Sequence, residues 1–192
     1  MEKLVHPFLY RSHDLDGLLK DTKKLSTFCS KLETQSMLFP DRYKPNDYKG
    51  DGFELFVEAL IKLSPIDNRI GICNYQPVDH NEDTGVDGIG IGVDGKVATV
   101  QVKYRSNKET LLTANKGNLS NFVTASLIKY NVDPASKVSM LIITTAEGLH
   151  YFTEAEMFLN KVRCIGYQDL RNFVDNNLNF WNAFRSLVKE SK

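Results

Sequence analysis

The spacing of hydrophobic residues predicts two amphipathic helices in the first third of the chain. Apolar side chains recur every three or four positions over residues 14–33, and Asp14 is a suitable N-cap for that helix. A second helix is predicted over residues 51–63, after a loop at 37–50 that is rich in Pro, Asp, Asn and Gly. Its apolar residues follow a helical core stripe and are Phe53, Phe56, Val57, Leu60 and Ile61.

Two carboxylates interrupt the apolar surface of the second helix. Glu54 and Glu58 lie one helical turn apart, and Lys62 follows Glu58 at the spacing of a surface ion pair. Glu54 has no such neighbour in the sequence. Because a carboxylate beside so much hydrocarbon is costly unless it is paired or bound to a cation, Glu54 is the stronger candidate for a functional role.

A β-hairpin is predicted from Gly85 to Tyr104, after a first strand at 69–78 and an acidic loop at 79–84. Its second strand carries Gln101 and Lys103, which share a face because strand side chains alternate.

The face on which Asp87 lies depends on the turn of this hairpin. A two-residue Asp94-Gly95 turn would point Asp87 away from Gln101, because a shift of one residue moves a side chain to the other face. A three-residue Val93-Asp94-Gly95 loop with a left-handed Gly95 would set Asp87 opposite Gln101. We predict the three-residue loop, or a bulge among the glycines with the same effect.

The second half alternates between helical and strand patterns, which predicts one α/β domain with a mixed sheet and helices on both faces. A polar and basic loop at 105–117 comes first. The elements expected after it are a helix at 118–130, a strand buried on both faces at 138–145, a helix at 153–161, a strand at 162–166 and a last helix from 168 onward.

Composition indicates the cellular environment of the protein more clearly than its function. The chain has 192 residues, with 24 Lys and Arg against 24 Asp and Glu, so any site for a polyanion must be a local patch. Three scattered cysteines and no long apolar run favour a soluble, intracellular (cytoplasmic) protein that does not enter a membrane. A glycine pattern at 90–95 and an acidic pattern at 79–90 resemble nucleotide and calcium loops, but each lacks a required feature.

The polar residues of the hairpin suit a hydrated divalent cation beside a phosphate. Asp87 would ligate the cation together with the Gln101 side chain and the backbone carbonyl of Val102, and Glu54 would act through water. Lys103 would orient or deprotonate the attacking water and contact the scissile phosphate. The same spacing is equally consistent with a solvated strand face and a turn carboxylate.

Four ordered features resemble the PD-(D/E)xK nuclease superfamily, and most closely its Mrr-like restriction endonucleases. They are the Phe53-Glu54 helix, Asp87 in GVDGIG, Gln101-Val-Lys103, and the later runs from Asn121, Leu141 and Phe152. The resemblance covers roughly residues 50–175 and implies a restriction-endonuclease-like α-β-β-β-α-β core, related to Holliday junction resolvases. Residues 1–48 would then be an N-terminal helical extension, and residues 49–192 the nuclease-like domain.

This resemblance implies a metal-dependent DNA endonuclease that uses Mg²⁺ or Mn²⁺, with Glu54, Asp87, Gln101 and Lys103 as the catalytic set. The expected phosphate contacts are Arg105, Lys108, Lys116, Lys44 and Lys49. Residues 1–48 are too short and too helical for the separate DNA-reading domain of Mrr enzymes. Target choice would then come from recognition of DNA structure, from a homodimer, or from a partner such as a helicase or a separate target-recognition subunit. Two alternatives stay open: an inactive nuclease-fold module that binds DNA or protein, and a structure-selective resolvase of the Holliday-junction type.

Overall fold

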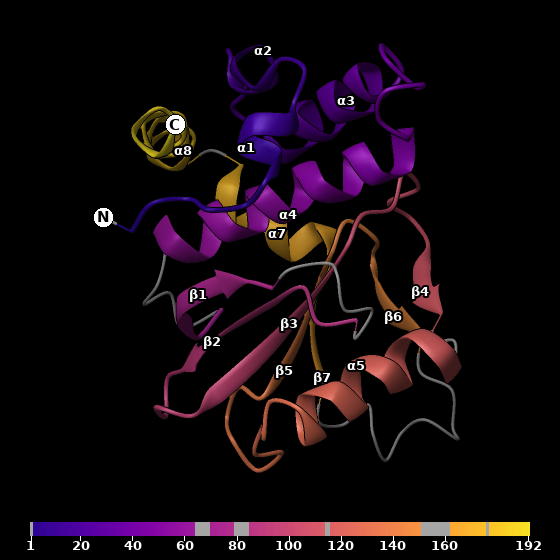
Figure 1. Cartoon of the computed structure of the whole chain (residues 1–192), viewed down its shortest axis with the longest axis vertical. Helices are drawn as coiled ribbons and strands as arrows, with labels where there is room; N and C mark the ends of the chain where they lie inside the picture. Colours follow the sequence, from indigo (N-terminus) through magenta and orange to yellow (C-terminus); the bar gives the residue numbers. More distant parts are fainter. Residues whose placement is uncertain (1, 64–69, 79–84, 114–115, 151–161, 176) are drawn as a thin grey trace. The chain divides into compact units, whose positions relative to one another are not determined.

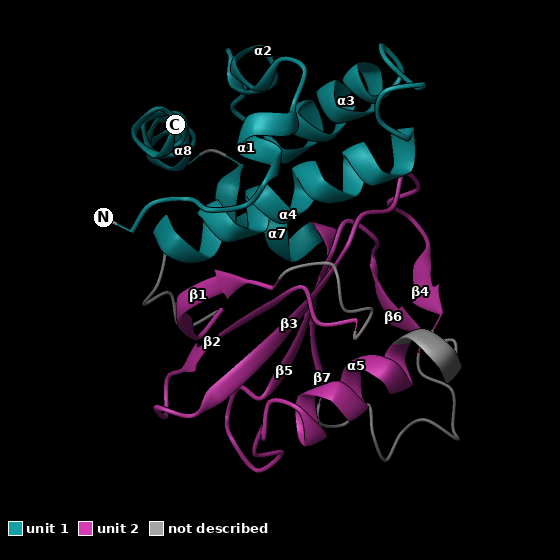
Figure 2. Cartoon of the chain, viewed as in Figure 1, with its two compact units in different colours: residues 1–63, 168–192 teal, residues 64–167 magenta. Residues whose placement is uncertain are grey.

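A computed structural model describes the chain except residues 1, 64–69, 79–84, 114–115, 151–161 and 176, and describes only the backbone of residues 116–118 (Figure 1). The chain forms two compact units (Figure 2). Residues 1–63 and 168–192 make a helical unit, and residues 64–167 make a unit built on a sheet. These units divide the chain at 63 and 167, whereas the boundary expected at 48/49 lies inside a helix, α4 (Pro45–Leu63).

Aromatic packing forms the core of the helical unit. The ring centroids of Phe28 and Phe56 lie 5.2 Å apart, and Trp181 lies 6.0 Å from each of them. Burying three large rings from distant parts of the chain removes apolar area from water and stabilises this unit. Its helices are α1 (Phe8–Arg11), α2 (Leu15–Leu19), α3 (Leu25–Ser36), α4, α7 (Tyr167–Val174) and α8 (Leu178–Ser191).

Two helices expected to be continuous are each split. Asp14 caps α2 as predicted, with its side chain accepting from the amide of Gly17 at 2.7 Å, but α2 ends at Leu19 and α3 begins only at Leu25. Asp21, between them, has a φ of 55°, a left-handed conformation that ends a helix. The single last helix expected from 168 onward is likewise two helices, α7 and α8.

The second unit contains a mixed five-stranded sheet, so the α/β class with a mixed sheet is confirmed. The sheet order is β1-β2-β3-β5-β7; the pairs β1–β2 and β2–β3 are antiparallel, and β3–β5 and β5–β7 are parallel. The strands are β1 (Ile72–Pro77), β2 (Gly88–Gly92), β3 (Val97–Lys103), β5 (Met140–Thr144) and β7 (Val162–Ile165). A small parallel sheet of β4 (Leu111–Thr113) and β6 (Gly148–His150) was not predicted.

One face of the sheet packs against α5 (Lys116–Ile128). Phe122 of this helix shares a buried cluster with Met140 and Ile142 of β5, and Thr99 Oγ1 of β3 lies 2.7 Å from Ser126 Oγ. Strand β5 is buried at all five positions, so the prediction of a strand buried on both faces is confirmed. The helix expected at 153–161 lies outside the described residues.

The hairpin has the turn that the glycine pattern predicted. The amide of Gly92 donates to the carbonyl of Lys96 at 2.8 Å, which closes the loop of residues 93–95, and Gly95 has a φ of +77°. The resulting register pairs Gly88 with Val100. A side chain at Gly88 would meet Tyr75, since an added Cβ would lie 2.2 Å from the Tyr75 hydroxyl oxygen. Close packing, as well as the turn, therefore requires glycine in this hairpin.

Candidate active site at the end of the hairpin

Asp87 is fixed where strands β2 and β3 separate. Its Oδ2 accepts a hydrogen bond from the amide of Val102 at 2.6 Å, and its own amide donates to the carbonyl of Val100 at 2.9 Å. Extending the strand register by one residue places Asp87 across from Gln101, as predicted. The carboxylate of Asp87 therefore binds the backbone between Gln101 and Lys103.

The side chain of Gln101 is oriented by the chain just before Asp87. Its Nε2 donates to the carbonyl of Gly85 at 2.8 Å, and only 4% of the residue is exposed. A carbonyl only accepts hydrogen bonds, so the nitrogen of the amide must face Gly85 and the oxygen must occupy the other branch. Among the described residues, Gln101 Oε1 has no hydrogen-bond partner. An acceptor oxygen is thus available for a ligand.

The backbone of Val102 faces the same side as the carboxylate of Asp87. The carbonyl of Lys103 accepts hydrogen bonds from the amide of Thr145 and the hydroxyl of Thr144, so the backbone polar groups of Lys103 point toward β5. Neighbouring residues of a strand bond in opposite directions, and the N–H and C=O of one residue point the same way. The carbonyl of Val102 therefore points toward the β2 side, where its amide binds Asp87.

A small hollow lies beside these residues on the α5 face of the sheet. Gln101, Lys103 and Arg105 line it, and its volume of about 30 Å³ leaves room for a solvent-sized group. Its other lining residues are Leu112, Thr113, Leu119, Ile142 and Leu149. Asp87 does not line the hollow. The structure therefore brings Gln101, Lys103 and Arg105 to one opening and holds Asp87 at the adjoining backbone.

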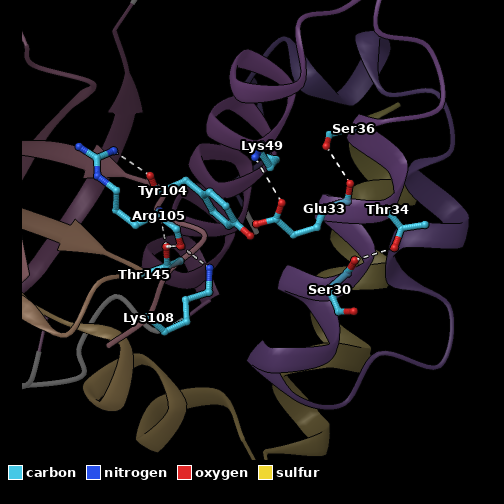
Figure 3. Close-up of polar contacts among 9 residues, drawn as sticks. All are labelled: Ser30, Glu33, Thr34, Ser36, Lys49, Tyr104, Arg105, Lys108 and Thr145. Carbon is cyan, nitrogen blue, oxygen red and sulfur yellow. Dashed lines mark hydrogen bonds and ion pairs between the residues drawn. The ribbon is translucent and has the colours of Figure 1, made fainter. Parts of the chain in front are cut away.

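Side chains bind the backbone of the loop that follows β3 (Figure 3). Thr145 Oγ1 accepts from the amide of Arg105 at 2.6 Å and donates to its carbonyl at 2.8 Å. Lys108 Nζ donates to the same carbonyl and lies 4.1 Å from the centre of the Tyr104 ring. The ammonium of Lys108 is therefore engaged within the loop, whereas the side chain of Arg105 is exposed. No role was predicted for Thr145, although a polar residue at the end of a buried strand was a usable signal.

Glu54 belongs to the helical unit and is paired there. Its Oε2 lies 3.2 Å from Nε2 of His6, a residue that is only 2% exposed. His6 Nδ1 accepts from the amide of Phe8 at 3.2 Å, so Nε2 carries the proton that faces Glu54. The sequence predicted neither the pairing of Glu54 with His6 nor the burial of His6. The role of Glu54 in a metal site stays a prediction.

The pair formed by Glu58 and Lys62 was predicted correctly, but its position at the surface was wrong. Glu58 is 0% exposed, and Lys62 Nζ lies 2.7 Å from its Oε1. The two oxygens of Glu58 also accept from the amides of Val5 and His6, and Lys62 donates to the carbonyl of Lys3. These additional hydrogen bonds satisfy the charges and allow the pair to be buried.

The other predicted phosphate contacts differ in their surroundings. Lys49 makes an ion pair with Glu33 at 3.3 Å, with 13% of its side chain exposed (Figure 3). Lys44 is exposed, and both lysines belong to the helical unit. The side chain of Lys116 lies outside the described residues. Among the predicted cations whose side chains are described, Lys103 and Arg105 line the hollow.

The donor atoms near Asp87 suit a weakly held, hydrated cation. Within the described part of the chain, no three Asp, Glu, His or Cys side chains gather in a group that could hold a metal ion. The oxygen atoms that the predicted site would use are the carboxylate of Asp87, the amide oxygen of Gln101 and the carbonyl of Val102. Such an oxygen-only set fits Mg²⁺, which keeps several of its waters and needs few protein ligands.

Comparison with known proteins identifies no family. No family model, no curated protein and no solved structure matches this chain. Within the described residues, no helix is long and apolar enough to cross a membrane.

Proposed function

We propose that this chain is a metal-dependent DNA endonuclease with a site built on Asp87, Gln101 and Lys103. The observation that carries the proposal is the hydrogen bond from the amide of Val102 to Asp87, which places a carboxylate at the backbone between the other two residues. The available oxygen of Gln101 and the hollow lined by Lys103 and Arg105 support it.

The order of the elements also supports the proposal. Within the described residues, helix α4 is followed by β1, β2 and β3, then by α5 and β5, with the short β4 between β3 and α5. This order agrees with the α-β-β-β-α-β core expected from the resemblance to PD-(D/E)xK nucleases. Asp87 lies directly before the second strand, and Lys103 is the last residue of the third.

Each residue has a distinct part in the proposed reaction. Asp87, the oxygen of Gln101 and the carbonyl of Val102 would hold Mg²⁺ or Mn²⁺, which supplies positive charge at the phosphate and favours ionisation of water. Lys103 binds the scissile phosphate and orients the attacking water. Arg105 binds a neighbouring phosphate with the several donors of its guanidinium. Glu54 stays a predicted member of the set.

A second candidate is a nuclease-fold module that binds DNA without cutting it. The observation that favours it is the neutral side chain of Gln101, which leaves Asp87 as the only carboxylate among the three hairpin residues. A site with less negative charge binds divalent cations more weakly. In such a module, Lys103 and Arg105 would contact phosphate as before, and the metal would be absent.

Cleavage of mixed DNA substrates with Mg²⁺ or Mn²⁺ tests the first candidate. Asp87→Asn is the sharper variant, because its side-chain oxygen still accepts from the amide of Val102 while the charge is lost. We expect Asp87→Asn and Lys103→Ala to lose cleavage, and the exposed-lysine control Lys137→Ala to keep it. Equal cleavage by all these proteins would rule out this site.

Calorimetric titration with Mn²⁺ separates the two candidates. An endonuclease should bind Mn²⁺ in the wild type and lose that binding in Asp87→Asn. DNA binding with no Mn²⁺ binding would favour the binding module. A comparison of four-way junctions with linear duplex as substrates then shows whether an active enzyme is a structure-selective resolvase.

A further inference from the structure

Two threonines at the end of β5 bind the backbone at the end of β3. Thr144 Oγ1 donates to the carbonyl of Lys103 at 2.8 Å and accepts from the amide of Ala146 at 3.0 Å. Thr145 Oγ1 binds both the amide and the carbonyl of Arg105, at 2.6 and 2.8 Å. Both threonines are 0% exposed. Since a hydroxyl has one proton, each donates once, and that proton goes to the backbone of a cationic residue.

These hydroxyls bind the backbone at the point where the backbone pairing of β3 with β5 ends. The amide of Thr145 donates to the carbonyl of Lys103 at 3.2 Å, next to the last paired residues, Lys103 and Thr144. Two residues further on, the N–H and C=O of Arg105 are both bound by one side chain instead of by a neighbouring strand. The backbone of Arg105 is therefore fixed relative to that of Lys103, although Arg105 lies outside β3.

Fixing these backbones matters because both cations line the same hollow. Neither Lys103 nor Arg105 makes an ion pair within the described residues. One nitrogen of Arg105, Nη1, donates to the carbonyl of Tyr104 at 2.9 Å, which leaves other guanidinium donors for a ligand. Two cations at one opening, with no acidic partner in the described part of the chain, suit an anionic ligand with more than one phosphate oxygen.

We propose that Thr144 and Thr145 are positioning residues that hold Lys103 and Arg105 together against the DNA backbone. This inference rests on the proposed function, because it takes DNA phosphate as the ligand. Thr145 is the more direct test, since its hydroxyl alone binds both backbone groups of Arg105. Without that hydroxyl, the backbone of Arg105 loses both of its hydrogen bonds to Thr145, and the position of the guanidinium is less restricted.

The test is binding of duplex DNA in EDTA over a series of salt concentrations, with wild type, Thr145→Val and Thr145→Ser. For each phosphate contact, log K falls with log salt by a slope of about 0.9. We expect Thr145→Val to bind at least threefold more weakly and to lower the slope by about 0.9, because the Arg105 contact is lost. Thr145→Ser keeps the hydroxyl and should restore the wild-type affinity and slope.

Thr99→Val is the matched control. Thr99 is also 0% exposed, and its hydroxyl lies 2.7 Å from Ser126 Oγ, so the substitution removes a buried hydrogen bond from the same sheet. We expect its urea unfolding midpoint to fall about as much as that of Thr145→Val, with DNA affinity and slope unchanged.

Three results would overturn the inference, and they identify what failed. If Thr145→Val keeps the wild-type slope while Arg105→Ala lowers it, the phosphate contact is real and the positioning role is wrong. If Thr99→Val weakens binding as much as Thr145→Val, the effect is one of general stability. If the wild type shows no salt-dependent binding, both the inference and the proposed function fail.

Discussion

The side chain of Gln101 faces the carbonyl of Gly85, which only accepts hydrogen bonds. The amide nitrogen of Gln101 donates a hydrogen bond to this carbonyl, and its amide oxygen can accept one from a ligand. An ionised carboxylate at this position would place a second acceptor against the carbonyl. Local hydrogen bonding therefore explains a neutral residue at position 101 without reference to catalysis.

Gln101→Glu should destabilise the protein at neutral pH by about 1–3 kcal/mol, the cost of leaving a buried polar group unsatisfied. A protonated carboxyl donates to Gly85 again, so folding raises the pKa of the introduced group above its unfolded value of about 4.3. The penalty is therefore present above the folded pKa and disappears as pH falls below the unfolded one. Urea unfolding at pH 7 and at acidic pH measures this, with the exposed Gln168→Glu as control. A penalty independent of pH would contradict the hydrogen bond to Gly85.

The two Glu–Lys pairs of the helical unit differ in burial, and this difference predicts their energies. Glu58→Ala leaves Lys62 buried and uncompensated, so we expect a loss of about 3–5 kcal/mol. The side chain of Glu33 is 38% exposed in its pair with Lys49, so Glu33→Ala should cost only about 0–1 kcal/mol. Unfolding in urea compares the two variants. Similar losses would show that burial does not determine the strength of these pairs.

Among the elements, the hairpin was predicted from sequence more accurately than the helices. Its register depends on a local feature, the loop of residues 93–95, and on strict alternation along two strands. The last residues of α2, before the break to α3, instead have partners farther along the chain. Lys31 Nζ binds the carbonyl of Gly17 at 3.1 Å, and Arg185, near the far end of the chain, binds that of Leu19 at 3.0 Å. Helical spacing carries no information about such contacts.

Gly95 provides a test of the turn at the element scale. An added Cβ would meet nothing within 4 Å, so a substitution there costs only the left-handed backbone conformation. We expect Gly95→Ala to lose about 1–2 kcal/mol and Gly95→Asn to lose less, because asparagine tolerates this conformation. The measurement is the urea unfolding midpoint of each variant. Equal losses from alanine and asparagine would contradict a left-handed residue at the turn.

For the whole molecule, the division into units could not be predicted from local patterns. The helical unit joins segments from both ends of the chain, and the amide of Leu4 donates to Ser191 Oγ at 2.9 Å, 187 residues away. The hairpin residues of the candidate site were predictable because they lie within one hairpin. Thr145 was missed because its contact to Arg105 joins residues 40 positions apart.

Because acidic and basic residues are equal in number, the proposed DNA binding would depend on the positions of cations that have no acidic partner. Arg105 and Lys49 were both predicted phosphate contacts, and only Lys49 is neutralised by an acidic partner, Glu33. Arg105→Gln should therefore lower the salt slope of DNA binding by about 0.9, and Lys49→Gln should leave it nearly unchanged. Fluorescence anisotropy of labelled duplex across salt concentrations measures both slopes. If Lys49→Gln lowers the slope as much as Arg105→Gln, DNA must displace Glu33 from Lys49, and the interface extends onto the helical unit.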